Sequence, residues 1–421
     1  MMASIKFYKE TNFKETPIGK IPKDWEIIKL GDTRRAKIIM GQSPPSSTYN
    51  KDGEGLPFLQ GKLEFGMIYP SPTVYCSQPL KIAEKSDILI SVRAPVGDVN
   101  IAPYRLCIGR GLAAIRFDSK EASSWFYFYY LQKIKHFLEN LGKGSTFKAI
   151  NKGDLEDLRL PFPPLSEQHE IAEVLYCVDF AIQRVDEAIA RAERLKKGLM
   201  QQLLTKGIGH KEYKETPIGK IPKTWKVVEL REIAQKFIGG GTPSTKVPRY
   251  WNGDIPWIRS VHLTRYYIDE SIIDQYITKE GLENSASNIV PKRNLIIATR
   301  VGIGKSAVNL IDVAINQDLT GVVIVPSMAD PFYLVRYLTS PKVVKMLESF
   351  SRGTTIKGVP LNHIKRLKVP LPPLNEQRRI TVILSSVDNL LQLKREKREK
   401  LVRMKRRLMD LLLTGKVRVS V

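Results

Sequence analysis

The segment Gly302-Ile303-Gly304-Lys305-Ser306 has the spacing that ends a phosphate-binding loop, in which Lys and Ser contact a nucleotide phosphate and its Mg²⁺. That motif also needs a leading Gly, and Thr299 stands at its position. The corresponding stretch earlier in the chain, Arg93 to Asp98, contains no Gly-Lys-Ser. The sequence therefore argues against ATP binding by this segment and favours a simple turn.

Two other stretches resemble catalytic motifs without completing them. Phe237-Ile238-Gly239-Gly240-Gly241 has the F-x-G-x-G spacing of a methyl-donor site. The Asp/Asn-Pro-Pro-aromatic motif that should accompany it is missing, because Asp330-Pro331-Phe332 lacks the second Pro. Asp24, Glu26 and Lys29 do not have the spacing of a nuclease site. We therefore expect no catalytic residues in this chain, and we expect that it is not an enzyme.

Metal and disulfide chemistry are not indicated either. The five histidines have no metal-ligand spacing, and the three cysteines lack a C-x-x-C pair. Met1 leads into a charged stretch without the apolar core of a signal peptide, and no run approaches the roughly 18 to 20 apolar residues of a membrane span. We expect a cytoplasmic protein with no metal and no membrane partner.

Polar, glycine-bearing loops that occur in pairs are the positive chemical signal. For example, Gly41-Gln42-Ser43 resembles Gly241-Thr242-Pro243, and Gly109-Arg110-Gly111 occupies the place of Asn316-Gln317-Asp318. Arg, Lys, Asn and Gln can read base edges, whereas Ser, Thr and Lys suit phosphates. The candidate DNA-binding residues are Gln42, Ser43, Arg93, Arg110, Ser145, Thr146 and Lys148 in the first half of the chain, and Thr242, Ser244, Lys246, Arg300, Lys305, Asn316, Gln317, Thr354, Thr355 and Lys357 in the second.

The charge of the chain agrees with a polyanionic partner. Its 67 Lys and Arg residues against 43 Asp and Glu give a formal net charge of +24. Such a charge attracts nucleic acid, with ribosomal surfaces, acidic lipid and acidic partner proteins as the alternatives. A length of 421 residues with 43% hydrophobic content predicts two domains with substantial cores.

Two landmarks recur along the sequence. The segment from Glu15 to Lys23 is identical to Glu215 to Lys223. The segment from Leu160 to Gln168 returns with changes as Val369 to Gln377. The repeat predicts one scaffold present in two versions, and hence a partner with two similar but non-identical halves.

Each copy has a mixed front and a helical rear. The β-type runs are 87–92 and 112–117 in the first copy, and 294–299 and 321–325 in the second. An aromatic helical stretch at 125–131 could stack on bases, but helical spacing favours a place in the core.

The rear of each copy predicts an amphipathic helix of roughly 35 to 40 residues, which spans about 50 to 60 Å. Ser166 and Asn375 are expected N-caps, and Glu167 and Glu376 place a carboxylate in the first turn. Each apolar stripe must pair, and the equivalent stripe lies in the other copy. The stripes are Ile171, Val174, Val178, Ala181, Val185, Ala188, Ala192, Leu195 and Leu199, and Ile380, Ile383, Val387, Leu390, Leu401, Met404, Leu408 and Leu411.

The predicted fold class is therefore α+β, with two mixed α/β domains related by an internal repeat and joined by two long antiparallel helices that form a coiled coil. We expect the first domain at residues 1–164 and its helix at 165–210. The second domain is expected at 211–373 and its helix at 374–421.

The repeated Pro-Pro-Leu-x-Glu-Gln, with the amphipathic helix that follows it, resembles the specificity subunit of type I restriction-modification enzymes. The resemblance covers essentially the whole chain and includes the Gly-Lys-Ile-Pro-Lys-x-Trp segments, Gly19 to Trp25 and Gly219 to Trp225. The second copy adds Tyr250 to Trp257 and Asn316-Gln317. The first copy departs from the family where Gly109-Arg110-Gly111 replaces Asn-Gln.

The resemblance implies a non-catalytic DNA-binding subunit. Each target-recognition domain would read one half of a bipartite, asymmetric site in double-stranded DNA, and the coiled coil would set the spacer. Two methyltransferase subunits would dock on the coil and bring S-adenosylmethionine, and two restriction and translocation subunits would bring ATP and Mg²⁺. No cofactor is expected to bind this chain itself. The alternative is a stand-alone DNA- or RNA-binding adaptor without methyltransferase partners.

Overall fold

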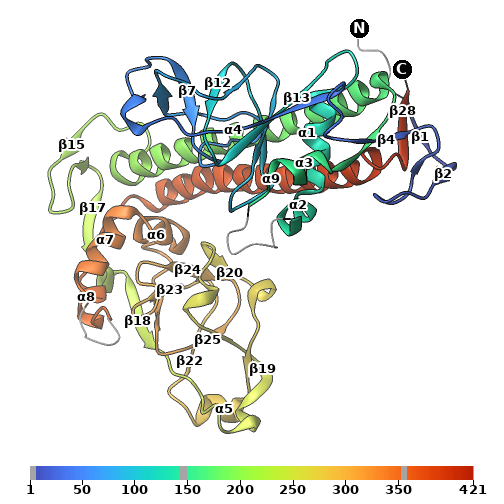
Figure 1. Ribbon diagram of the computed structural model, residues 1–421. Coiled ribbons are helices and arrows are strands. Elements are labelled where there is room, and N and C mark those ends of the chain that lie inside the picture. The colour runs from blue at the N-terminus through green and yellow to red at the C-terminus, as the bar shows by residue number, and fades with distance from the viewer. Residues whose placement is uncertain (1–5, 142–148, 352–357, 421) are drawn as a thin grey trace. The chain divides into compact units, whose positions relative to one another are not determined.

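The computed structural model describes residues 6–141, 149–351 and 358–420, and the chain divides into two compact units. Unit 1 comprises Met1–Glu187 and Glu396–Val421, and unit 2 comprises Ala188–Arg395. The two long helices, α4 (Leu165–Lys206) and α9 (Leu374–Leu412), are each cut by these boundaries. Each unit therefore contains one half of each helix (Figure 1).

Unit 1 is built on two small sheets. The first has the order β11-β10-β13-β5 and the second the order β6-β8-β7-β12-β9. Their strands are β5 (Ala36–Met40), β6 (Tyr49–Asn50), β7 (Leu56–Leu59), β8 (Val74–Cys76), β9 (Ile82–Ala83), β10 (Ile88–Ser91), β11 (Val99–Ile101), β12 (Leu106–Ile108) and β13 (Leu112–Phe117). The remaining elements are β1 (Lys6–Lys9), β2 (Phe13–Lys14), β3 (Ile21–Pro22), β4 (Glu26–Lys29), α1 (Ser124–Lys133), α2 (Lys135–Leu141), α3 (Lys152–Glu156), β14 (Arg159–Phe162) and β28 (Val417–Ser420).

Unit 2 repeats this plan. Its first sheet has the order β18-β26-β23-β24-β20 and its second the order β21-β19-β25-β22. Their strands are β18 (Ala234–Gly239), β19 (Trp251–Ile258), β20 (Tyr267–Ile268), β21 (Tyr276–Ile277), β22 (Asn288–Val290), β23 (Leu295–Ala298), β24 (Ser306–Asn309), β25 (Val313–Ile315) and β26 (Leu319–Ile324). The remaining elements are β15 (Tyr213–Lys214), β16 (Ile221–Pro222), β17 (Lys226–Glu229), α5 (Lys279–Glu283), α6 (Pro331–Leu338), α7 (Pro341–Ser349), α8 (Leu361–Lys365) and β27 (Lys368–Leu371).

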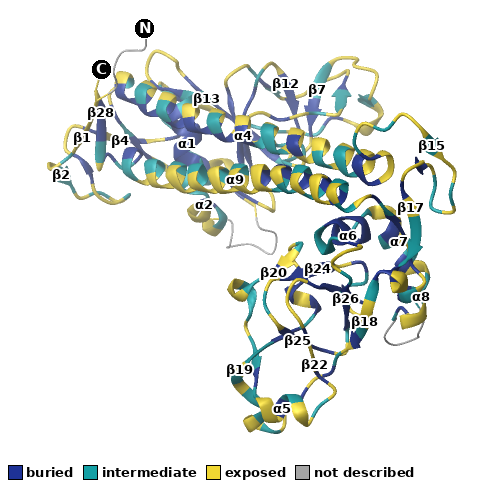
Figure 2. Cartoon of the chain, turned by 180° about the vertical axis from the view of Figure 1, so that it is seen from behind, coloured by how far each residue is buried: buried dark blue, intermediate teal, exposed yellow. Residues whose placement is uncertain are grey.

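The predicted α+β class and the internal repeat are confirmed. The order β11-β10-β13-β5 of unit 1 returns as β24-β23-β26-β18 in unit 2. The four sequence runs predicted as strands correspond to β10, β13, β23 and β26. The aromatic stretch forms α1, whose residues from Phe126 to Leu131 are buried, so its place is in the core, as predicted (Figure 2).

The repeated Glu-Gln pair and the repeated Trp hold the start of each long helix to the unit in which that helix begins. The indole of Trp25 donates to Glu167 Oε2 at 3.1 Å, and Trp225 donates to Glu376 Oε2 at 3.0 Å. Both tryptophans are almost fully buried. Gln168, next to Glu167, donates to the Pro163 carbonyl at 2.9 Å, so the motif has a structural role at the start of the helix.

Reciprocal ion pairs join the two long helices within each unit. In unit 1, Lys405 of α9 binds the buried Asp179 of α4 at 2.7 Å. In unit 2, the roles are exchanged, and Lys196 of α4 binds Asp388 of α9 at 2.6 Å. The start of one helix therefore pairs with the end of the other in both units, which makes the pairing antiparallel. Buried charge pairs at one position are the kind of contact that fixes helix register.

Two details of the helix prediction are wrong. The helices begin at Leu165 and Leu374, so Ser166 and Asn375 lie inside the first turn and are not N-caps. Leu195, Leu390 and Met404 are 52%, 42% and 44% exposed. A straight helix drifts by about 20° per heptad relative to a strict seven-residue repeat, so the buried face passes to neighbouring residues. Leu391, next to Leu390, is 4% exposed.

The C-terminal strand β28 closes unit 1 by pairing antiparallel with β1. Arg418 of β28 is 8% exposed in its side chain and contacts three carboxylates. It donates to Glu167 at 2.5 and 2.7 Å, to Glu10 at 2.8 Å and to Asp24 at 2.8 and 3.0 Å. Asp24, weighed above as a possible catalytic carboxylate, is thus part of an ion-pair network that ties the two ends of the chain together.

Candidate nucleic-acid interface

A pair of parallel strands in each unit brings the polar loops together. In unit 1, β7 and β12 run parallel, with Leu59 opposite Ile108. In unit 2, β19 and β25 run parallel, with Ile258 opposite Ile315. The ends of parallel strands meet at one edge of a sheet, so the residues that follow these strands are neighbours although they lie far apart in the sequence.

In unit 1, a glycine turn after β5 packs against this edge. A Cβ on Gly41 would lie 2.1 Å from the Gly109 carbonyl oxygen, so the close approach requires glycine. The Gln42 amide donates to Ile108 O at 3.0 Å, and the Gly109 amide donates to Leu59 O at 2.8 Å. The Val92 amide donates to Gly111 O at 3.0 Å, which places Arg93, the next residue, beside the same loop.

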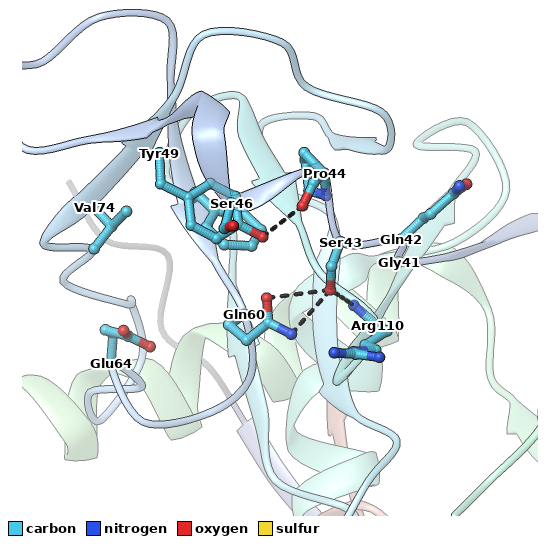
Figure 3. Close-up of a pocket in the computed structure, with 11 residues that line it drawn as sticks. Gly41, Gln42, Ser43, Pro44, Ser46, Tyr49, Gln60, Glu64, Val74 and Arg110 are labelled. Atoms are coloured by element: carbon cyan, nitrogen blue, oxygen red, sulfur yellow. Dashed lines mark hydrogen bonds between the residues drawn. The ribbon is translucent and has the colours of Figure 1, made fainter.

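The side chain of Ser43 is the hydrogen-bonding centre of this cluster. Its Oγ accepts from Gln60 Nε2 at 2.9 Å and from the Arg110 backbone amide at 3.2 Å. These residues line an open cavity of about 780 Å³, which Tyr49 also lines (Figure 3). Burial raises the pKa of Tyr49, whose hydroxyl donates to Pro44 O at 2.8 Å. Apolar side chains, among them Phe58 and Val74, line the cavity together with neutral polar groups, the Arg110 cation and the Glu64 carboxylate.

Unit 2 has the same arrangement with different side chains. The Asn316 amide donates to Ile258 O at 3.1 Å, and the Gly241 amide donates to Ile315 O at 3.0 Å. Thr242 Oγ1 donates to Gln317 Oε1 at 2.6 Å, so a hydroxyl again holds a glutamine.

These bonds correct the alignment of the glycine turns. A Cβ on Gly240 would lie 2.3 Å from the Asn316 carbonyl oxygen, as one on Gly41 would lie beside Gly109. Gly41 therefore corresponds to Gly240, not to Gly241, and Ser43 corresponds to Thr242. The sequence pairing was one residue out of register because it matched a run of glycines without the bonds that distinguish them.

The structure also brings the predicted arginines to the same edge. The Thr299 amide donates to Asp318 O at 2.8 Å, which sets Arg300 next to the loop that carries Gln317. Arg93 and Arg300 are exposed, as are Gln42, Arg110, Thr242 and Gln317. These six predicted residues, three in each unit, therefore face solvent at one edge of their unit.

Other predicted residues have different settings. Asn316 is 3% exposed, and its amide group donates to Asp318 Oδ2 at 2.9 Å, so it shapes the loop. Lys305 is exposed near the end of the turn between β23 and β24, and Ser244 and Lys246 are exposed after the glycine turn. Ser145, Thr146, Lys148, Thr354, Thr355 and Lys357 lie outside the described residues.

Gln60 and Arg259 also lie at these edges, although neither is among the residues predicted from the sequence. Gln60 directly follows β7, and Arg259 directly follows β19, so they occupy equivalent positions. The signal was present in Leu56-Pro57-Phe58-Leu59-Gln60 and Ile255-Pro256-Trp257-Ile258-Arg259, which align on their prolines.

The described part of the chain contains no group of three or more His, Cys, Asp or Glu residues that could hold a metal ion, and none of its helices has the length and apolar content of a membrane span. Burial and the neighbouring Cys76 raise the pKa of Cys107 to about 11, which keeps that thiol neutral. The segment from Gly302 to Ser306 joins the two strands β23 and β24, so it lacks the strand-to-helix setting of a phosphate-binding loop.

Comparison with known proteins gives one consistent result. The family model for the type I restriction modification DNA specificity domain matches residues 22–190 and 222–403. The MjaVIII type I restriction enzyme specificity subunit of Methanocaldococcus jannaschii is 28% identical over 433 residues, covering 100% of this chain and 99% of that protein. A second protein of that organism, the putative MjaX specificity subunit, is 54% identical over 198 residues, which are 47% of each chain.

A solved structure has the same fold. The S subunit of the type I restriction-modification system from M. genitalium superposes with a TM-score of 0.60 at 17% identity, covering 92% of this chain and 96% of that one. The family model covers well over half of the chain, in two copies that follow the internal repeat. The chain therefore belongs to the family of type I restriction-modification specificity subunits, which are non-catalytic DNA-recognition subunits.

Proposed function

We propose that each unit reads one half of a bipartite, asymmetric site in double-stranded DNA. The observation that carries this proposal is the duplicated edge, where equivalent backbone bonds present different side chains: the exposed Gln60 and Arg110 in unit 1, and the partly exposed Arg259 and exposed Gln317 in unit 2. Equivalent scaffolds suit equivalent duplex geometry, and different side chains suit different base sequences. The net charge of +24 supports phosphate contacts on either side.

We further propose that residues 1–164 and 211–373 act as the two target-recognition domains, and that 165–210 and 374–421 act as the spacer. The reciprocal pairs Asp179–Lys405 and Asp388–Lys196 support a fixed helix register, and a fixed register supports an unread gap of constant length. The helices also provide the surface on which two methyltransferase subunits dock. Those subunits bring S-adenosylmethionine, and two restriction and translocation subunits bring ATP and Mg²⁺.

The stand-alone adaptor makes a different prediction about partners. A specificity subunit co-purifies with a methyltransferase subunit from its own cell, whereas an adaptor does not. Co-purification of the untagged chain with a protein that binds S-adenosylmethionine separates the two.

The variants Arg93→Ala and Arg300→Ala test the proposal that each unit reads one half-site. Each change should weaken the reading of one half-site only, measured as methylation by the reconstituted complex on DNA varied in that half-site. The two changes should affect opposite half-sites. A base contact is worth about 1 to 3 kcal/mol. Because the two arginines share no partner, the double variant should show nearly additive losses.

The matched control is Arg105→Ala, which removes an exposed arginine at the opposite end of β12. It should leave both half-sites unchanged. If Arg93→Ala and Arg300→Ala disturb the same half-site, the two units do not read separate halves. An equal loss on every sequence would make these arginines phosphate contacts.

A further inference from the structure

Four residues at the ends of the parallel strands form two equivalent pairs whose side-chain types are exchanged. The position after β7 is Gln60 in unit 1 and the equivalent position after β19 is Arg259 in unit 2. The position two residues after β12 is Arg110, and its equivalent after β25 is Gln317. Each unit thus presents one arginine and one glutamine, in opposite places.

The equivalence rests on the backbone and not on sequence similarity. The Gly109 amide binds Leu59 O at 2.8 Å, and the Asn316 amide binds Ile258 O at 3.1 Å. In both units, this bond joins the residue before the glutamine to the residue before the arginine. The glutamine and the arginine of each unit are therefore held side by side by the same hydrogen bond.

A hydroxyl from the glycine turn orients the glutamine in both units, although the glutamine comes from a different strand in each. Ser43 Oγ accepts from Gln60 Nε2 at 2.9 Å, and Thr242 Oγ1 donates to Gln317 Oε1 at 2.6 Å. Ser43 Oγ also lies 3.2 Å from Gln60 Oε1, so it contacts both amide atoms of Gln60, whereas Thr242 contacts one amide atom of Gln317; both glutamine side chains stay exposed. A fixed amide at a solvent-facing edge suits a bidentate contact to a base edge better than a freely rotating one.

The arginines keep donors available. Arg110 is exposed, and its guanidinium borders the cavity in Figure 3. Arg259 is partly exposed, with its Nη2 3.8 Å from Asp274 Oδ2 and its guanidinium carbon 5.9 Å from the Trp257 ring centre.

We propose that Gln60 with Arg110, and Arg259 with Gln317, are the specificity-determining pairs of the two half-sites, with arginine reading guanine and glutamine reading adenine. Arginine is bidentate to guanine O6 and N7, and glutamine is bidentate to adenine N6 and N7. Because arginine and glutamine are exchanged between the equivalent positions, the two units read guanine and adenine at opposite positions of their half-sites. This inference rests on the proposed function and names the residues that perform it.

The test is the exchange Gln60→Arg with Arg110→Gln in the full chain, reconstituted with its methyltransferase subunits. This variant gives unit 1 the residue types of unit 2. Methylation rates are measured on a DNA series in which each position of both half-sites is varied. The variant should lose about 30-fold or more on the original target, because two base contacts worth about 1 to 3 kcal/mol each are lost. Its methylation rate should rise on the target in which the guanine and adenine of the first half-site have changed places.

Two further arms keep the test decisive. Single Gln60→Ala and Arg110→Ala variants should each lose discrimination between bases at one position of the first half-site. An equal loss of methylation whatever base is varied would overturn the proposal. Arg105→Gln makes the same chemical change as Arg110→Gln at the opposite end of β12 and should leave specificity unchanged.

The positioning role of the hydroxyl has its own readout. Ser43→Ala should relax the Gln60 position, whereas Ser43→Thr, the residue type of unit 2, should retain it. If the exchange variant methylates the unaltered first half-site with unaltered preference, the assignment of these pairs is wrong although the two-unit function stands. If the wild-type complex methylates no bipartite site, the proposed function itself fails.

Discussion

Binding of target DNA by the chain with its methyltransferase subunits is expected to weaken by about 10³- to 10⁵-fold when salt rises from about 50 to about 200 mM, if the complex neutralises about 6 to 10 phosphates. Each lysine or arginine that meets a phosphate releases counterions, so the logarithm of the binding constant falls linearly with the logarithm of the salt concentration. The chain's net charge of +24 favours such contacts.

The measurement is a titration of labelled duplex at several salt concentrations, with a duplex lacking the target as the control. Binding to the control duplex should fall with a comparable slope, because phosphate contacts are independent of sequence. A flat salt response would show that the charge of this chain serves a partner other than DNA.

Arg418→Met is expected to lower the free energy of unfolding of unit 1 by about 3 to 5 kcal/mol, because it leaves buried carboxylates without their cation. Glu167 is 6% exposed and receives two of the five hydrogen bonds from Arg418. The loss should appear as faster hydrogen exchange in β1 and β28, which this residue ties to the long helix.

Two controls separate charge from packing. Lys416→Met changes an exposed cation just before β28 and should have little effect. Adding Glu167→Gln to Arg418→Met should restore part of the loss, since a neutral amide can still accept from the Trp25 indole. An Arg418→Met variant as stable as the wild type would contradict the assignment of this network as the closure of unit 1.

The same network predicts that the stability of unit 1 falls at acid pH. The pKa of Asp24 is lowered chiefly by its hydrogen bond with Arg418, and the pKa of Glu10 is lowered first by the Asn12 and Thr11 amides and then by Arg418. A lowered folded pKa contributes stability above the unfolded value, and this is lost as pH falls through the folded pKa. The Arg418→Met variant should therefore lose less additional stability than the wild type below about pH 4, near the unfolded pKa values of these acids.

The elements of each unit that depend on local pattern could be predicted from the sequence. Short apolar runs bounded by Gly and Pro predicted β10, β13, β23 and β26, and the helical spacing of the aromatics placed α1 in the core. The repeated landmarks predicted two copies of one scaffold because they carry its structural bonds, such as Trp25 to Glu167 and Trp225 to Glu376.

What depends on contacts between distant segments could not be predicted. Gln60 joins the candidate site only because β7 lies parallel to β12, nearly fifty residues later, and periodicity does not encode strand partners. The register of Gly41 against Gly240 is fixed by carbonyl contacts, which a run of glycines does not reveal. The pairing of β28 with β1 joins the two ends of the chain and leaves no local pattern.

A map of the adenines that the reconstituted wild-type complex methylates across a genome tests the two-unit function most directly. We expect methylation at one motif, made of two short, different sequences separated by an unread gap of constant length. Each half is expected to be read by one unit, and the constant gap by the fixed register of α4 and α9. A single continuous motif, or two halves at variable separation, would contradict the two-unit function.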